Sequence, residues 1–156
     1  GRIPEGRVSE ELVGQYDFLP TLLDYAGVAN PLAATLPGRS FAGLLRGAGH
    51  GEERPVVVYD EYGPVRMIRD RRWKLVRRFD GTADELYDLD ADPGETRNLA
   101  GSAACRAVEA GLRAQLAAWF ERYADPRRDG ARLPVTGMGQ TGRCEEGARA
   151  FAPHPG

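Results

Sequence analysis

The chain has 156 residues, of which 42% are hydrophobic and 28% charged, and its formal net charge is −2. This length and composition are ordinary for a soluble globular protein, and the balanced charge argues against nucleic acid or an anionic membrane as partner. No apolar run approaches the roughly 20 residues of a membrane span. Cys105 and Cys144 define no disulfide framework, and the compartment stays open because the chain begins with neither a start methionine nor a signal peptide.

The first predicted element is a helix over residues 17–27. Asp17 stands where an N-cap is expected, Pro20 falls in the first turn, and Gly27 is typical of a helix end. Apolar residues recur at helical spacing and predict one buried stripe, formed by Leu19, Leu22, Leu23 and Ala26. Residues 28–55 are rich in loop-forming residues, with a short helical turn expected over 41–45.

Four strands are predicted next, over residues 55–59, 65–69, 73–79 and 85–89, and their short connections indicate antiparallel neighbours. The valine run of the first strand suits burial on both faces. A helix from Ser102, as its cap, to Tyr123 would then cover the sheet. Glu109 and Arg113 form a favourable pair on its outer face. Its apolar stripe consists of Val108, Leu112, Leu116, Phe120 and Tyr123, with Trp119 beside it. Residues 126–156 read as an extended tail.

The segment 85–100 combines a strand with an acidic turn at Asp92-Pro93-Gly94. Asp88, Asp90 and Asp92 occupy the first, third and fifth positions of a possible calcium loop. Such a loop also needs glycine at its sixth position and an acidic residue at its twelfth, where this chain has Pro93 and Leu99. We therefore favour a solvated acidic turn.

Several segments in order resemble the sulfatase branch of the alkaline-phosphatase-like superfamily. They are Pro4–Gly6, Val13–Gly27, Pro37–Phe41, Leu44–Gly47, Val65–Arg69, Arg72–Val76 and Glu85–Ala100. The resemblance implies an α/β fold of which this chain is the C-terminal part. Residues 1–54 would end the large α/β domain. Residues 55–125 would form an α+β C-terminal subdomain with a four-stranded antiparallel sheet covered by one helix, and residues 126–156 its tail.

The resemblance also implies a chemistry: hydrolysis of sulfate esters or sulfamates by a formylglycine, made from Cys or Ser in Cys/Ser-x-Pro-x-Arg, beside a divalent cation, usually calcium. Neither Cys105 nor Cys144 lies in that motif. We expect the nucleophile and metal ligands to lie upstream, in a missing N-terminal catalytic domain. The isolated chain should then be inactive, and the substrate would be a small-molecule or carbohydrate sulfate ester. Two alternatives stay open, a fragment of a phosphonate or phosphate ester hydrolase of the same superfamily and a non-enzymatic binding module.

Individual candidates for chemistry are few. Thr35 has the spacing of the nucleophile motif, with Thr in place of Cys or Ser, but a Pro-Gly turn explains the segment better. Asp17 suits a helix cap better than a metal ligand, and His50 and His154 read as solvated residues.

The substrate-binding candidates are Glu61, Tyr62 and Arg66, in and beside the first hairpin turn, because a polar loop after a buried strand commonly carries function. Lys74 and the neighbouring arginines could meet an anion. We favour a salt-bridged sheet face for that group, with Asp60, Glu61, Asp70 and Asp80 as partners. The arginines are Arg66, Arg69, Arg71, Arg72, Arg77 and Arg78.

Overall fold

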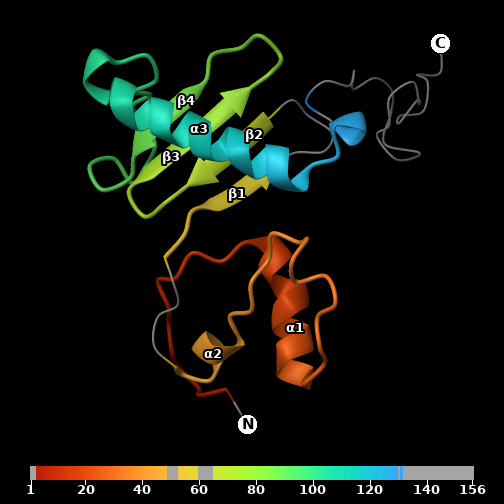
Figure 1. Ribbon diagram of the computed structural model, residues 1–156. Coiled ribbons are helices and arrows are strands. Elements are labelled where there is room, and N and C mark those ends of the chain that lie inside the picture. The colour runs from red at the N-terminus through yellow and green to blue at the C-terminus, as the bar shows by residue number, and fades with distance from the viewer. Residues whose placement is uncertain (1–2, 49–52, 60–64, 130, 132–156) are drawn as a thin grey trace, which may run out of the picture. The chain divides into compact units, whose positions relative to one another are not determined.

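The computed structural model describes residues 3–48, 53–59, 65–129 and 131. The chain divides into two compact units, Gly1–Val56 (unit 1) and Val57–Gly156 (unit 2). Unit 1 holds the short helices η1 (Gln15–Asp17), α1 (Phe18–Ala26) and α2 (Ala42–Leu45) (Figure 1). Unit 2 holds the sheet and the long helix α3 (Arg106–Tyr123). None of the described helices is long and apolar enough to cross a membrane.

Helix α1 ends where the sequence predicts. Gly27 adopts a left-handed conformation with φ of 72°, and its N–H donates to the carbonyl of Asp24. This φ suits glycine because no Cβ clashes there. Its start differs from the prediction, since the Asp17 carboxylate accepts from the N–H of Gly14 at 2.8 Å and makes no cap bond to α1. The aspartate therefore serves the preceding turn, η1.

The apolar stripe predicted for α1 is not covered within the described residues. Leu19 and Leu22 are exposed, whereas Pro20 and Thr21 are the buried residues of this helix. Helical periodicity identifies an apolar face, but it does not say that the same chain covers that face.

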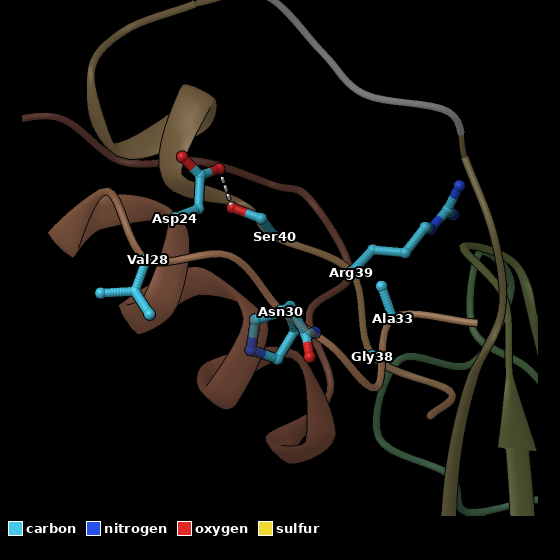
Figure 2. A pocket seen from close by; sticks show the side chains of 8 residues that line it. Asp24, Val28, Asn30, Ala33, Gly38, Arg39 and Ser40 are labelled. Carbon is cyan, nitrogen blue, oxygen red and sulfur yellow. Dashed lines mark hydrogen bonds between the residues drawn. The ribbon is translucent and has the colours of Figure 1, made fainter. Parts of the chain in front are cut away.

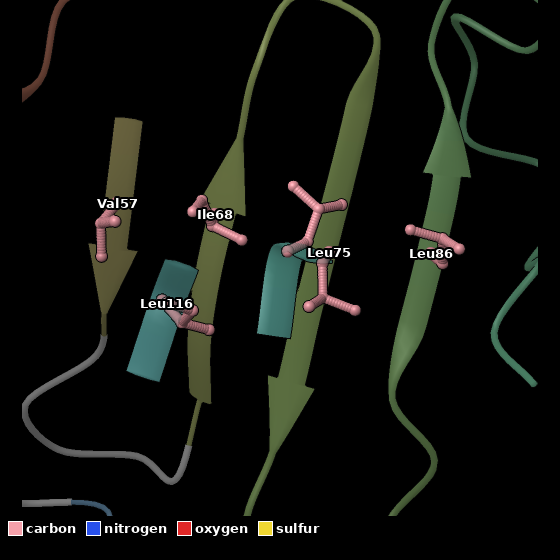
Figure 3. Packing of buried hydrophobic residues seen from close by; sticks show 6 residues of the cluster. Val57, Ile68, Leu75, Leu86 and Leu116 are labelled. Atoms are coloured by element: carbon pink, nitrogen blue, oxygen red, sulfur yellow. The ribbon is translucent and has the colours of Figure 1, made fainter. Parts of the chain in front are cut away.

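Four strands form the sheet in the order β1-β2-β3-β4, which confirms the predicted architecture. Strand β1 is Val56–Tyr59, β2 is Val65–Arg69, β3 is Trp73–Arg78 and β4 is Glu85–Asp88. Both β2–β3 and β3–β4 are antiparallel, and the register places Ile68, Leu75 and Leu86 side by side. One row of apolar side chains thus runs across the sheet (Figure 3).

Helix α3 lies across one face of the sheet (Figure 1). Leu112 and Leu116 of the helix are buried in one cluster with side chains of all four strands, Val57, Ile68, Leu75 and Leu86 (Figure 3). Burial of a leucine or isoleucine side chain contributes about 1.5–3 kcal/mol each. This cluster is therefore the main stabilising feature of unit 2.

Two local predictions in unit 2 need correction. Strand β1 is buried on both faces only at its start, because the successive residues Val56 and Val57 are buried while Val58 and Tyr59 are exposed at the edge of the sheet. Ser102 makes no side-chain cap bond, since a 3-10 turn, η2 (Ala103–Cys105), precedes α3.

The motif after β4 extends the sheet edge. Asn98 Oδ1 accepts from the N–H of Leu86 at 3.0 Å, and its Nδ2 donates to the carbonyl of Asp84 at 3.0 Å. The N–H of Leu99 donates to the carbonyl of Leu86 at 2.8 Å. Residues 98 and 99 thus satisfy backbone groups of the edge strand that would otherwise face solvent.

Candidate functional site

The predicted substrate-side residues divide into two groups. Glu61 and Tyr62 lie outside the described residues. Arg66 lies on β2, where its Cζ is 3.7 Å from the centroid of the Phe120 ring and its guanidinium forms an ion pair with Asp129. Stacking on an aromatic face and pairing with a carboxylate are both typical of arginine. In this structure Arg66 joins β2 to α3 and to the segment after it.

Phe120 also belongs to an aromatic cluster. The ring of Tyr59 lies 5.6 Å from that of Phe120 and 6.1 Å from that of Trp119, and Tyr123 extends the row at 5.2 Å from Trp119. These centroid separations fall in the range of favourable edge-to-face contacts. The cluster fixes the edge strand β1 against the C-terminal half of α3.

A charged network centres on Asp84, which precedes β4. Its carboxylate pairs with Arg113 at 2.6 Å and Arg77 at 3.3 Å, and Arg113 also pairs with Glu109 at 2.6 Å. The predicted Glu109–Arg113 pair is therefore confirmed, but it is joined to the sheet by Asp84. Partial burial raises the pKa of Asp84, yet the Arg78 N–H and the Arg113 guanidinium outweigh it, so this pKa lies below its usual range. Hydrogen bonds from the Gly101 N–H and Arg113 lower the pKa of Glu109.

A second network lies on β3 and β4. Lys74 Nζ pairs with Glu95 at 2.5 Å, Arg78 pairs with Glu85 at 2.6 Å, and the Tyr87 hydroxyl donates to Glu85 at 2.8 Å. The Arg78 and Tyr87 hydrogen bonds lower the pKa of Glu85. The salt-bridged interpretation is thus confirmed for these side chains. Their partners come from later in the chain than predicted, because strand pairing brings distant residues together.

The aspartates of the acidic turn form an ion pair and hydrogen bonds with neighbouring residues. Asp88 pairs with Arg72 at 2.8 Å, and Asp92 accepts from the Arg97 N–H at 2.8 Å and the Thr96 hydroxyl at 3.0 Å. Arg72 holds the pKa of Asp88 below its ordinary value. The described residues include no group of three or more His, Cys, Asp or Glu side chains suited to a metal. The carboxylates of this turn are engaged by these partners and do not fit a calcium site.

Unit 1 carries an open pocket with a cavity volume of about 330 Å³ (Figure 2). Asp24 on α1 accepts a hydrogen bond from the Ser40 hydroxyl at 2.5 Å across it, and Arg46 approaches Asp24 at 3.7 Å. Sequence reasoning missed this pocket, because its polar groups come from α1 and from a loop 16 residues later in the chain. Its lining consists of Pro20, Asp24, Val28, Asn30, Ala33, Gly38, Arg39 and Ser40.

The remaining candidates have structural surroundings. The Thr35 hydroxyl donates to the Leu32 carbonyl at 3.1 Å within a turn over residues 31–35, which lies before Pro37-Gly38. Cys105 is half-buried and packs against the core of unit 2. His50, His154 and Cys144 lie outside the described residues.

Comparison with known proteins identifies the family of this chain. Residues 1–122 match the family described as "N-sulphoglucosamine sulphohydrolase, C-terminal". The chain belongs to the sulfatase family. It is a C-terminal sulfatase portion of the alkaline-phosphatase-like superfamily, as its ordered motifs and its sheet with one covering helix indicated.

Individual relatives show the extent of the likeness. The Delta 4,5-hexuronate-2-O-sulfatase of Bacteroides thetaiotaomicron is 40% identical over 119 residues, which are 72% of this chain and 24% of that relative. A solved putative sulfatase from the same organism has a TM-score of 0.58 at 38% identity, covering 71% of this chain and 27% of the other. The phosphonate monoester hydrolase of Silicibacter pomeroyi has a TM-score of 0.61 at 26% identity, covering 80% and 28%. The sulfatase chain thus spans about a quarter of the length of such relatives.

Proposed function

We propose that this chain is the C-terminal part of a hydrolase that cleaves sulfate esters or sulfamates, with the formylglycine and the calcium held by a catalytic portion outside it. The family match over residues 1–122 carries the proposal. The 40% identical relative, a hexuronate-2-O-sulfatase, supports a sulfated carbohydrate as the substrate class. Within this assignment, unit 2 is a rigid support whose charged side chains are used in internal ion pairs.

A chimeric enzyme tests the proposal. This chain replaces the matched C-terminal region of the Bacteroides hexuronate-2-O-sulfatase, and turnover of that enzyme's own 2-O-sulfated substrate is measured. We expect the chimera to be active and the isolated chain to hydrolyse no aryl sulfate with calcium present, because this chain lacks the Cys/Ser-x-Pro-x-Arg motif. A well-folded chimera without turnover would contradict the proposal.

The second candidate function is hydrolysis of phosphonate or phosphate esters. The TM-score of 0.61 to the Silicibacter enzyme favours it as the alternative. The matched control is a second chimera, with this chain in place of the C-terminal region of that hydrolase, assayed on a phosphonate monoester. Activity of this chimera alone would favour the alternative. Two inactive chimeras, together with a monomeric and cooperatively folded isolated chain, would favour a binding module.

We also propose that the segment containing Glu61 and Tyr62, with Arg66 beside it, lies on the substrate side of the enzyme. Arg66→Lys in the active chimera provides the test. Lysine keeps the positive charge but loses the planar stacking on Phe120. A rise in KM with unchanged kcat would support substrate contact, whereas unchanged kinetics with a lower melting temperature would assign Arg66 to packing alone.

A further inference from the structure

The outer strand of the sheet carries an aromatic surface on the side of α3. Strand β1 comes first in the order β1-β2-β3-β4, and Val58 and Tyr59 at its end are 50% and 52% exposed. The Tyr59 ring lies 6.1 Å from the Trp119 ring, and Tyr123 continues the row one helical turn later. We call Tyr59, Trp119 and Tyr123 the β1 edge patch. Apolar and aromatic side chains grouped at a surface commonly mark a site of interaction.

The two edges of the sheet are finished differently. At β4, Asn98 and Leu99 bond to the backbone of Leu86. At β1, the described part of the chain contributes aromatic contacts from α3 but no further strand. An outer strand with exposed apolar residues is a template for pairing with another extended segment, and native proteins usually cover or charge such an edge.

The segment after α3 brings the chain back toward this edge. The Asp125 carboxylate caps a short 3-10 turn, η3 (Pro126–Arg128). Asp129 then forms its ion pair with Arg66 of β2, and the two side chains are only 12% and 14% exposed. The N–H of Ala131 donates to the Asp129 carboxylate at 3.1 Å. The chain is therefore held at Asp129 beside β2, the strand that neighbours β1.

The sequence that follows Ala131 suits an added outer strand. Leu133 and Val135 alternate with Pro134 and Thr136, so two apolar side chains would share one face of a strand. Proline has no N–H to donate, and within a sheet it is tolerated in an outer strand where its N–H side faces solvent. The backbone groups of Leu133 and Val135 would then point the other way, toward the neighbouring strand.

We propose that the segment Leu133–Thr136 pairs along β1 as a fifth strand, with Leu133 and Val135 covering the β1 edge patch. A second copy of this chain would have to bind from solution, whereas this segment follows closely after the ion-paired Asp129. A segment tethered by so short a linker acts at an effective concentration in the millimolar range. The family match ends at residue 122, so the added strand lies outside the matched region and does not depend on the ester that the enzyme hydrolyses.

Amide hydrogen exchange in the full chain tests the proposal. We expect the amides of β1 to exchange at least about tenfold faster in Val135→Asp than in the parent, because a carboxylate buried against the aromatic rings would release the added strand. Val135→Ile should keep the parent rate. Thr136→Asp is the matched control, since its side chain would face away from the patch, and it should also keep the parent rate. Equal β1 exchange in Val135→Asp and the parent, or an equal effect of Thr136→Asp, would overturn the proposal.

Nuclear Overhauser contacts in the unaltered chain give a measurement that depends on no variant. We expect cross-peaks between the methyl groups of Leu133 or Val135 and the ring protons of Tyr59 or Trp119. A sample that mixes isotope-labelled with unlabelled chains identifies the source of the strand. Cross-peaks within single chains would support the proposal, whereas cross-peaks between labelled and unlabelled chains would identify a second copy and overturn it. The absence of all such cross-peaks would overturn it as well.

The sulfatase chimera separates this proposal from the proposed function. Protection of the β1 amides should be the same in the isolated chain and in the chimera, because the covering segment belongs to this chain. Protection that appears only in the chimera would identify the catalytic portion as the cover of the patch and would overturn the proposal. The amides of Leu112–Leu116 serve as the internal reference, since their core is complete within unit 2. Turnover by the chimera does not enter this comparison.

Discussion

Replacing Asn98 with alanine should weaken unit 2 without touching its apolar core. The side chain makes three hydrogen bonds: it accepts from the N–H groups of Leu86 and Ala100 at 3.0 and 2.9 Å, and it donates to the Asp84 carbonyl at 3.0 Å. A net contribution of about 0.5–1.5 kcal/mol per bond gives a total of roughly 1.5–4.5 kcal/mol. Asn98 is exposed, so water can replace part of what is lost. We therefore expect a loss near the lower end, about 2 kcal/mol.

Tryptophan fluorescence in a denaturant titration provides the assay, because both tryptophans, Trp73 and Trp119, belong to unit 2. Asn98→Asp is the informative intermediate, since it keeps the oxygen that accepts two of the three bonds and removes only the donated one; about a third of the loss is expected. Arg97→Ala controls for substitution at the neighbouring exposed position and should change the unfolding free energy by less than about 0.5 kcal/mol. A loss below about 0.5 kcal/mol for Asn98→Ala would refute the view that this side chain completes the sheet edge.

Three further predictions concern packing, charge and backbone contact. Leu116→Ala should cost about 2–5 kcal/mol in the same titration because its site is fully buried, whereas Gln115→Ala, on the exposed side of α3, should be near neutral. The lowered pKa of Asp84 stabilises the fold above the unfolded-state value of about 4, and this stability should be lost as the pH falls through the folded-state pKa. Asp84→Asn should flatten that acid dependence, and an unchanged slope between about pH 5 and 2 would argue against the network. A Cβ at Gly38 would clash with the Tyr16 carbonyl oxygen, so Gly38→Ala should speed exchange of the Thr21 amide. A Cβ at Gly43 would make only an ordinary contact, so Gly43→Ala should leave that exchange rate unchanged.

Local patterns were sufficient to predict the sheet and its covering helix. The later strands carry their own alternation and the first a valine run, the connections are short, and the stripe of α3 includes the buried Leu112 and Leu116. These signals are local because antiparallel neighbours joined by short turns lie close in sequence. Ion-pair partners were less predictable. Lys74 pairs with Glu95 across 21 positions, and no spacing rule in a single sequence links residues so far apart.

The candidate site was harder to predict from the sequence, for a different reason. Sequence reasoning placed substrate contacts at Glu61, Tyr62 and Arg66, of which only Arg66 is described, and there it contacts Phe120 and Asp129. The resemblance to sulfatases assigns the nucleophile to a motif that this chain lacks, so no pattern within these residues could reveal it. The sequence does predict structural features: the sheet and helix that pack together in unit 2, and the apolar stripe on α1.

The two units differ in how their apolar side chains are used, and this difference separates two kinds of mutation. Unit 2 buries its leucines between α3 and the sheet, so changes there should act on folding whether or not a partner is present. Unit 1 buries Asp17 and Thr21 and exposes Leu19 and Leu22. Changes of Leu19 and Leu22 should therefore leave the stability of the isolated chain nearly unchanged. A substitution that lowers activity of the chimera can be assigned to one class or the other by its effect on the isolated chain alone.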